Sequence, residues 1–210
     1  DPASLALAGQ AYMQSHDYAK ATKYFEQAAA ASPKDSSFLA RLGASRLAVG
    51  ETDQAIKDLQ SAANMDAGGS KADALLVLAN LNARRFDQAL TAAQAWAKKQ
   101  PKNPVPYLLE GRAYLGASDS KNARAAFEQA LKAQAGYFPA TLALARLDLD
   151  GGQIDAAHER LAHYVQQNGK DAQAMLALAE LAARQGDGQE EADWLEKAVT
   201  TVQASFNRRP

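Results

Sequence analysis

The sequence predicts an all-α fold, a solenoid of six stacked helical hairpins, on two observations. The chain repeats itself every 34 residues without an insertion or deletion, and within each repeat the apolar residues follow helical spacing. One column of the repeat is small in five units and acidic in the sixth: Ala21, Ala55, Ala89, Ala123, Ala157 and Glu191. The six units that this register defines are 2–35, 36–69, 70–103, 104–137, 138–171 and 172–205, followed by a tail at 206–210.

Three further columns keep the same register. One holds a larger residue in most units: Phe25, Leu59, Ala93, Phe127, Leu161 and Leu195. The next follows three residues later: Ala28, Ala62, Trp96, Ala130, Tyr164 and Ala198. An earlier column is small in most units: Gly9, Gly43, Val77, Gly111, Ala145 and Ala179. Residues at i, i+4 and i+7 share one helix face, so the three later columns predict a buried face on the second helix of each unit. Small residues in the glycine column and in the alanine column should let the two helices approach closely where they cross.

Turn residues separate the two helices expected in each unit. Five units have such a turn: Ser15-His16-Asp17, Gly50-Glu51, Ser118-Asp119, Gly151-Gly152 and Gly186-Asp187. Glycine supplies left-handed geometry at the end of one helix, and Asp or Ser caps the start of the next. Pro33 and Pro101 close units one and three, where a proline stops a helix. Each unit is therefore predicted to be one antiparallel hairpin, with packing rearranged around Val77 and Trp96 in unit three.

Composition argues against several classes of function. The 23 basic and 24 acidic residues leave a net charge of −1, without the basic excess that nucleic-acid binding favours. The basic pairs Arg84-Arg85, Lys98-Lys99 and Arg208-Arg209 are interpreted as solvated helix ends. The chain has no cysteine, so disulfides and thiolate sites are excluded, and it has no apolar run long enough to span a membrane. It begins at Asp1-Pro2 without a targeting signal and is expected to be a mature or excised segment.

The sequence offers no catalytic constellation, and we predict neither an enzyme nor a cofactor. His158 and His163 are five residues apart on one expected helix, so they point along different faces and cannot share a metal as an i, i+4 pair could. Together with His16 they are interpreted as surface residues. Glu190 and Glu191 are placed at a helix start, where carboxylates favour the helix dipole.

The first unit resembles the tetratricopeptide repeat family. Its stretch LALAGQAYMQSHDYAKATKYFEQAAAASP matches the family signature at Gly9, Tyr12, Tyr18, Ala21, Phe25, Ala28 and Pro33. The resemblance extends over residues 2–205 and implies a right-handed superhelix whose first helices line a concave, protein-binding side. The tail at 206–210 is too short for a capping helix, so we expect a segment of a longer array or self-association through the sixth repeat. Trp194, Leu195, Ala198 and Val199 of that repeat are expected to offer an apolar surface.

Units four to six carry a narrower resemblance. The strings YLLEGRAYL and GYFPATLALARLDLDGGQIDAA are similar to the repeat lipoproteins of bacterial exosortase (PEP-CTERM) systems. This resemblance implies a periplasmic scaffold, associated with the outer membrane through an anchor outside this segment, in exopolysaccharide biosynthesis or export. A cytoplasmic location stays open.

The candidate site is the concave face that the family resemblance implies. We expect it to bind a protein or peptide through an apolar groove with arginines at its edge: Leu78, Leu81, Asn82, Leu108, Arg112, Leu115, Leu142, Arg146, Leu149 and Arg184. Arg112 and Arg146 are one repeat apart and are expected to project side by side. The same leucines could instead only pack the first helices against each other. Two other functions are open, a self-assembling structural array and, less favoured by the charge balance, an RNA-binding helical repeat.

Overall fold

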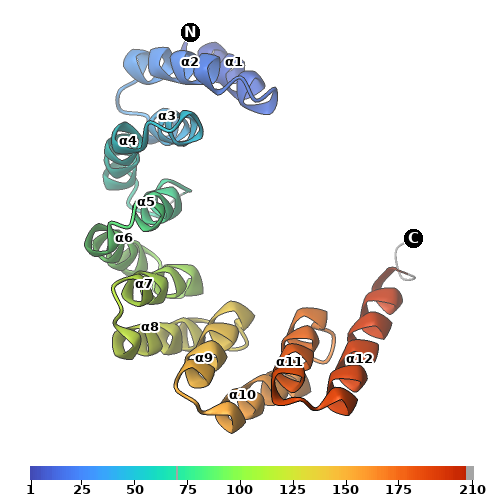
Figure 1. Ribbon diagram of the computed structural model, residues 1–210. Helices are drawn as coiled ribbons and strands as arrows, with labels where there is room; N and C mark the ends of the chain where they lie inside the picture. Colours follow the sequence, from blue (N-terminus) through green and yellow to red (C-terminus); the bar gives the residue numbers. More distant parts are fainter. Residues whose placement is uncertain (70, 207–210) are drawn as a thin grey trace. The chain divides into compact units, whose positions relative to one another are not determined.

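The computed structural model describes residues 1–69 and 71–206, and within them it contains twelve α-helices and no strand (Figure 1). The predicted all-α fold is confirmed, and each 34-residue unit holds two helices. In chain order the helices are α1 (Pro2–Gln14), α2 (Tyr18–Ala31), α3 (Ser36–Val49), α4 (Thr52–Met65), α5 (Lys71–Asn82), α6 (Phe86–Lys99), α7 (Pro104–Gly116), α8 (Ser120–Ala133), α9 (Phe138–Asp150), α10 (Ile154–Gln167), α11 (Ala172–Gln185) and α12 (Gly188–Phe206).

Every hairpin turns through one residue with left-handed backbone geometry, and these residues are 34 apart: His16, Gly50, Arg84, Ser118, Gly152 and Gly186. Glycine adopts this conformation without steric cost, whereas other residues pay for the clash of their Cβ atom. The next helix often starts from an aspartate, as at α2, where Asp17 accepts a hydrogen bond from the Lys20 amide. In unit three, Arg84 takes the left-handed position, so the turn there carries no glycine signal.

The chain divides into two compact units, residues 1–123 and 124–210, called here the N-terminal and C-terminal units. In the N-terminal unit each helix from α1 to α7 packs on an adjacent one, and α5 also contacts the first helices α3 and α7. In the C-terminal unit α9, α10, α11 and α12 pack in order, and α9 also contacts α11. Each unit is thus held mainly by contacts between neighbours, as in repeat proteins generally.

The predicted columns form the cores of the hairpins. Ala21, Ala55 and Ala157 are fully buried, as the register requires. A Cβ atom added to Gly9 would lie 2.8 Å from Cε1 of Phe25, and one added to Gly43 would lie 2.6 Å from Cγ of Leu59. The predicted close approach at these glycines is confirmed, because even a Cβ atom there would overlap a side chain of the second helix.

Two sequence interpretations need correction. Lys99 is not a solvated helix end, since only 19% of its side chain is exposed and it is paired with Asp73. At the C-terminal end, the sequence predicts an apolar surface made by Trp194, Leu195, Ala198 and Val199. Ala198 is instead buried and Trp194 packs half-buried on the core, whereas Leu195 and Val199 are exposed. The pair Arg208-Arg209 lies outside the described residues.

Among the residues that the structure describes, no helix is both long and apolar enough to cross a membrane. The longest, α12, has acidic residues in its first turn and polar residues along its length.

Candidate functional site

The first helices of successive repeats form a continuous layer in each unit. In the N-terminal unit α3 contacts α5 and α5 contacts α7, while in the C-terminal unit α9 contacts α11. Figure 1 shows α3 and α5 on one side of α4 and α6. We call the side of this layer that points away from the second helices the first-helix face. The N-terminal unit and the C-terminal unit each have a cavity on this face.

The N-terminal groove is a cavity of about 360 Å³ over α1, α3 and the start of α5. It is lined by Gln10, Met13, Phe25, Ser36, Ser37, Ala40, Arg41, Ala44, Asp66, Lys71, Ala72 and Leu75. Short side chains leave this space open, because Ala40 and Ala44 stand one helical turn apart on the face of α3 that points into it.

Charged groups stand at the edges of the N-terminal groove. Nη1 of Arg41 donates a hydrogen bond to Oε1 of Gln10 at 3.2 Å, which links α3 to α1. The exposed Lys71 lies at the start of α5. Asp66, at the end of α4, accepts a hydrogen bond from the Gly68 amide through Oδ1 at 2.9 Å. The groove thus has two cationic groups and one carboxylate around an apolar floor.

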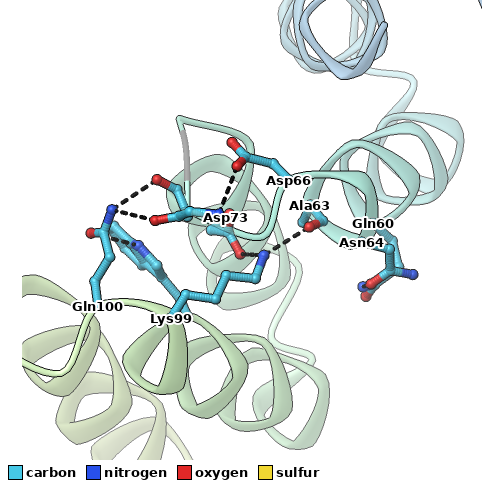
Figure 2. Close-up of polar contacts among 10 residues, drawn as sticks. Gln60, Ala63, Asn64, Asp66, Asp73, Lys99 and Gln100 are labelled. Carbon is cyan, nitrogen blue, oxygen red and sulfur yellow. Dashed lines mark hydrogen bonds and ion pairs between the residues drawn. The ribbon is translucent and has the colours of Figure 1, made fainter. Parts of the chain in front are cut away.

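A polar cluster joins α4, α5 and α6 next to Asp66, one of the residues that line this groove (Figure 2). Nζ of Lys99 lies 2.7 Å from Oδ1 of Asp73 on α5 and 2.7 Å from the carbonyl oxygen of Ala63 on α4. Asp73 is 3% exposed, so its charge would be costly without a partner.

The neighbouring Gln100 holds the loop between α4 and α5. Its Nε2 donates to the carbonyl oxygens of Gly68 at 2.9 Å and Gly69 at 2.8 Å, and its Oε1 accepts from Nε1 of Trp96 at 3.2 Å. This loop leads from Asp66 to Lys71, two of the charged groups of the N-terminal groove. The cluster therefore holds the loop that carries this edge of the groove.

The C-terminal groove is a cavity of about 240 Å³ between α9 and α11, with one residue from α10. It is lined by Leu142, Ala145, Arg146, Leu149, Asp150, Leu161, Ala177, Glu180, Leu181 and Arg184. Four residues of the sequence-predicted site, namely Leu142, Arg146, Leu149 and Arg184, therefore come together at one place.

The two arginines of the C-terminal groove differ in their partners. Nη2 of Arg184 lies 2.8 Å from Oε1 of Glu180, and both side chains are 63% exposed, so water screens the pair. Arg146 is exposed and, within residues 1–69 and 71–206, has no ion pair. Its guanidinium is available to a carboxylate from a partner, beside the apolar side chains of Leu142 and Leu149.

The other predicted site residues lie on α5 and α7 of the N-terminal unit, outside both grooves. Leu78 and Leu81 are half-buried and pack against the core, while Leu108 is also half-buried. Asn82 and Arg112 are exposed, and Leu115 is 39% exposed. Arg112 belongs to the N-terminal unit and Arg146 to the C-terminal unit. That the two arginines project side by side therefore stays a prediction.

Sequence reasoning missed the N-terminal groove, although it used the right columns. The predicted site rests on the large leucines of units three to five, yet large side chains also fill space. In unit two, Ala40 stands at the repeat position of Leu108, and Ala44 stands at that of Leu78. These two small residues are the signal in the sequence that predicts the hollow. A groove needs both apolar walls and room between them.

The histidines take part in local contacts. Nε2 of His158 lies 2.8 Å from Oε1 of Glu190, which also accepts from Nε1 of Trp194 at 3.1 Å. Both hydrogen bonds lower the pKa of Glu190, and the bond with His158 has the larger effect. In the described part of the chain no group of three or more His, Asp or Glu side chains is arranged to hold a metal ion.

Known proteins resemble this chain in its repeats. A tetratricopeptide repeat family model matches residues 40–104, 108–141 and 142–207, and a second one matches residues 2–35. No curated protein sequence matches the chain.

Several solved structures share the fold. A tetratricopeptide repeat protein from Parabacteroides merdae has 16% identity and a TM-score of 0.71, covering 95% of this chain and 79% of that one. PilF of Pseudomonas aeruginosa has 17% identity and a TM-score of 0.69, with 92% and 88% covered. MamA has 19% identity and a TM-score of 0.68, with 82% and 94% covered.

At these identities the structures share the fold, while the family models assign the repeats themselves over most of the chain. Stacked hairpins with an open first-helix face form a scaffold of the kind that binds other proteins. The chain belongs to the tetratricopeptide repeat family.

Proposed function

We propose that the chain is a scaffold that holds a segment of a partner protein on its first-helix face, with the C-terminal groove as the main contact. One observation carries the proposal: the exposed guanidinium of Arg146 lines the same cavity as Leu142 and Leu149. An apolar surface beside a cation that has no ion pair within the described residues suits a segment with apolar anchors and an acidic residue between them.

The energetics of such a contact divide between the two kinds of residue. Burial of apolar side chains supplies most of the affinity in peptide recognition, and a bidentate arginine–carboxylate contact adds orientation. The exposed ion pair between Arg184 and Glu180 can open at little cost, because surface pairs contribute at most about 1 kcal/mol. Arg184 then offers a second cation to the same partner.

The test is recovery of native partners with the wild-type chain and with an Arg146→Glu/Arg184→Glu variant, which reverses both cations of the C-terminal groove. Both arginines are exposed, so the variant should remain as helical as the wild type, which circular dichroism checks. A matched control, Lys57→Glu/Lys132→Glu, changes the net charge equally at exposed positions on the second helices α4 and α8. Partner recovery should fall in the arginine variant and stay unchanged in the control. Equal recovery from all three proteins would contradict the proposal.

The narrower role is a scaffold for exopolysaccharide biosynthesis or export, in the periplasm and attached to the outer membrane. Support for this role comes only from the sequence resemblance of units four to six. Deletion of the gene should then reduce exported polysaccharide, and the protein should fractionate with the cell envelope. Normal polysaccharide export in the deletion strain would contradict this role and leave the partner-binding proposal intact.

A further inference from the structure

The rim of the C-terminal groove carries two charges of each sign. Arg146 and Glu180 occupy the ninth position of units five and six, and Asp150 and Arg184 occupy the thirteenth. Along α9 the cation therefore precedes the anion, whereas along α11 the anion precedes the cation. All four side chains are exposed. The rim as a whole is neutral, so the order of its charges, rather than their sum, has to recognise a partner.

The two sides of the rim differ in how their charges are used. On α11, Glu180 and Arg184 form an ion pair with each other at 2.8 Å. On α9, Arg146 and Asp150 are also four residues apart, yet neither has an ion pair within residues 1–69 and 71–206. The α9 side thus presents one cation and one anion to a partner, about 6 Å apart along the helix axis.

Asp150 lies where a carboxylate does not help the fold. It is the last residue of α9, and the C-terminal end of a helix carries the negative pole of the helix dipole. In the other five first helices the thirteenth residue is neutral or basic: Gln14, Ala48, Asn82, Gly116 and Arg184. The carboxylate of Asp150 is therefore unfavourable for α9 itself. A group that breaks a local rule at the edge of a cavity is characteristic of a functional site.

We infer that Asp150 selects the partner, so that the C-terminal groove takes a protein segment with one acidic and one basic residue on the same face. The acidic residue pairs with Arg146 and the basic residue with Asp150. A purely acidic segment would gain at Arg146 but would bring like charge to Asp150 and Glu180, and such repulsion is how a site rejects a wrong partner. This inference rests on the proposed function and narrows its partner to a segment with charges of both signs.

The size of the groove favours a protein segment over a small molecule. Pockets for small molecules measure about 300–1,000 Å³, whereas this cavity measures about 240 Å³. It has room for inserted side chains, and its lining includes Ala145, Ala177 and Leu181. An acid and a base span the distance from Arg146 to Asp150 when they are four residues apart on a helix or two apart on an extended strand.

The test exchanges the two charges of α9 and asks whether the preferred peptide changes with them. A displayed library of random peptides is selected in parallel on the wild-type chain, on Arg146→Asp/Asp150→Arg and on a control, Glu128→Lys/Lys132→Glu. Both variants keep the net charge of the chain. The control exchanges an exposed pair, also four residues apart, on the second helix α8, and neither residue lines the groove.

The wild type and the control should enrich the same peptides, with an acid and a base at a fixed spacing. The Arg146→Asp/Asp150→Arg variant should enrich peptides in which the acid and the base are exchanged. The best wild-type peptide, made synthetically, should bind this variant roughly tenfold more weakly, because two attractions at exposed positions become repulsions.

The failure of the inference can be told apart from that of the proposed function. Peptides that carry an acid but no base, and that the exchange weakens, would overturn the inference and leave the proposed function standing. Peptides that bind all three proteins equally, or a library without any binder, would contradict both.

A further variant, Asp150→Asn, separates selection from stability. It should bind a purely acidic version of the best peptide, with the basic residue replaced by glutamate, more tightly than the wild type does. Its melting temperature should equal or exceed that of the wild type, because the end of α9 loses an unfavourable charge. A lower melting temperature, or an unchanged preference between the two peptides, would overturn the inference.

Discussion

Repeats two and five place a charge at the same position of the hairpin but with opposite signs. Arg46 on α3 and Asp148 on α9 are each the eleventh residue of their units, 36–69 and 138–171. Nη1 of Arg46 lies 2.5 Å from Oδ2 of Asp58 on α4, and Oδ2 of Asp148 lies 2.9 Å from Nε of Arg160 on α10. Asp58 and Arg160 also occupy equivalent positions, so both repeats form an ion pair at the same two positions, with the charges exchanged.

The second helix of the preceding repeat completes both clusters. Arg46 reaches Glu26 of α2 at 2.6 Å, and Asp148 reaches Arg124 of α8 at 2.7 Å. The eleventh position thus lies where three helices meet. The geometry of the repeat decides that the side chains there touch, whereas the sign of the charge is free as long as all partners change with it.

The two clusters differ in burial. The side chain of Asp148 is 2% exposed, whereas that of Arg46 is 17% exposed, and the Glu26 partner of Arg46 is 45% exposed. A buried charge that loses its partners costs more than one that water can reach. We therefore expect repeat five to depend more strongly on its charges than repeat two.

The largest expected effect is that of Asp148→Arg, which places three arginines together in repeat five. The free energy of unfolding should fall by about 4 kcal/mol or more, because the new charge is buried beside like charges. Adding Arg124→Glu and Arg160→Asp gives the new arginine a carboxylate partner on each of the two neighbouring helices, as Arg46 has, and should recover most of the loss. Urea unfolding measures all three proteins. A triple variant no more stable than Asp148→Arg would show that the cluster of repeat five does not tolerate a reversal of its charges.

A smaller loss, about 2 kcal/mol, is expected for Arg46→Met in repeat two. Asp58 would lose its partner, while the more exposed Glu26 stays hydrated. Burial already raises the pKa of Asp58, and Arg46 opposes that rise, so the pKa should climb further in the variant.

The pH dependence of Arg46→Met gives an independent check. A carboxyl whose pKa is higher in the folded than in the unfolded state favours folding most at low pH, and this contribution is lost as pH rises through the folded pKa. The stability deficit of the variant should therefore shrink between neutral and mildly acidic pH in urea unfolding. A deficit that grows on acidification would mean that Asp58 is not the group left without a partner.

Another position distinguishes the two repeats by an aromatic ring with a hydroxyl group, since repeat five has Tyr164 where repeat two has Ala62. Burial, and then the hydrogen bond to Oδ2 of Asp171 at 2.9 Å, raises the pKa of Tyr164 to about 12. Tyr164→Phe should cost about 1 kcal/mol at neutral pH, the usual value of one hydrogen bond.

Alkaline titration should separate the hydroxyl from the ring. The stability due to the neutral hydroxyl is present below the ordinary pKa of 10.0 and is lost as pH rises through about 12. The difference in thermal stability between wild type and Tyr164→Phe should therefore vanish over that range. A constant difference would assign the effect to packing of the ring.

The smallest expected effect is that of His158→Ile, which introduces the residue that repeat two has at this position, Ile56. His158 and Glu190 are 34% and 31% exposed, so their pair contributes about 0.5 kcal/mol. Because His158 lowers the pKa of Glu190, the stabilisation is present above its ordinary value of 4.5 and is lost as pH falls through the lowered pKa. In acid, the melting temperature should therefore change less steeply with pH in the variant than in the wild type. An identical pH profile would contradict the pairing of His158 with Glu190.

The 34-residue period and its turn residues were enough to predict the hairpins, since both the alanine column and the turns depend on local spacing. Ala55 and Ala157 are buried where the 34-residue period places them, and Gly50 and Gly186 turn the chain where glycine predicts a turn. Arg84 takes the same backbone geometry in unit three without that signal, because there the length of the repeat outweighs the preference of the residue.

Which side chains meet between helices depends on how the helices pack, and the sequence pattern does not predict it. Lys99 reads as a solvated helix end in the sequence, but it pairs with Asp73, 26 residues earlier, because α5 and α6 bring the two together. The grooves were likewise decided by volume, since Ala40 and Ala44 leave a hollow on one face while Leu78 and Leu81 fill space on another. A repeat period fixes the face on which a residue lies, but the pairing of charges and the room left between side chains depend on residues of neighbouring helices, which the period does not specify.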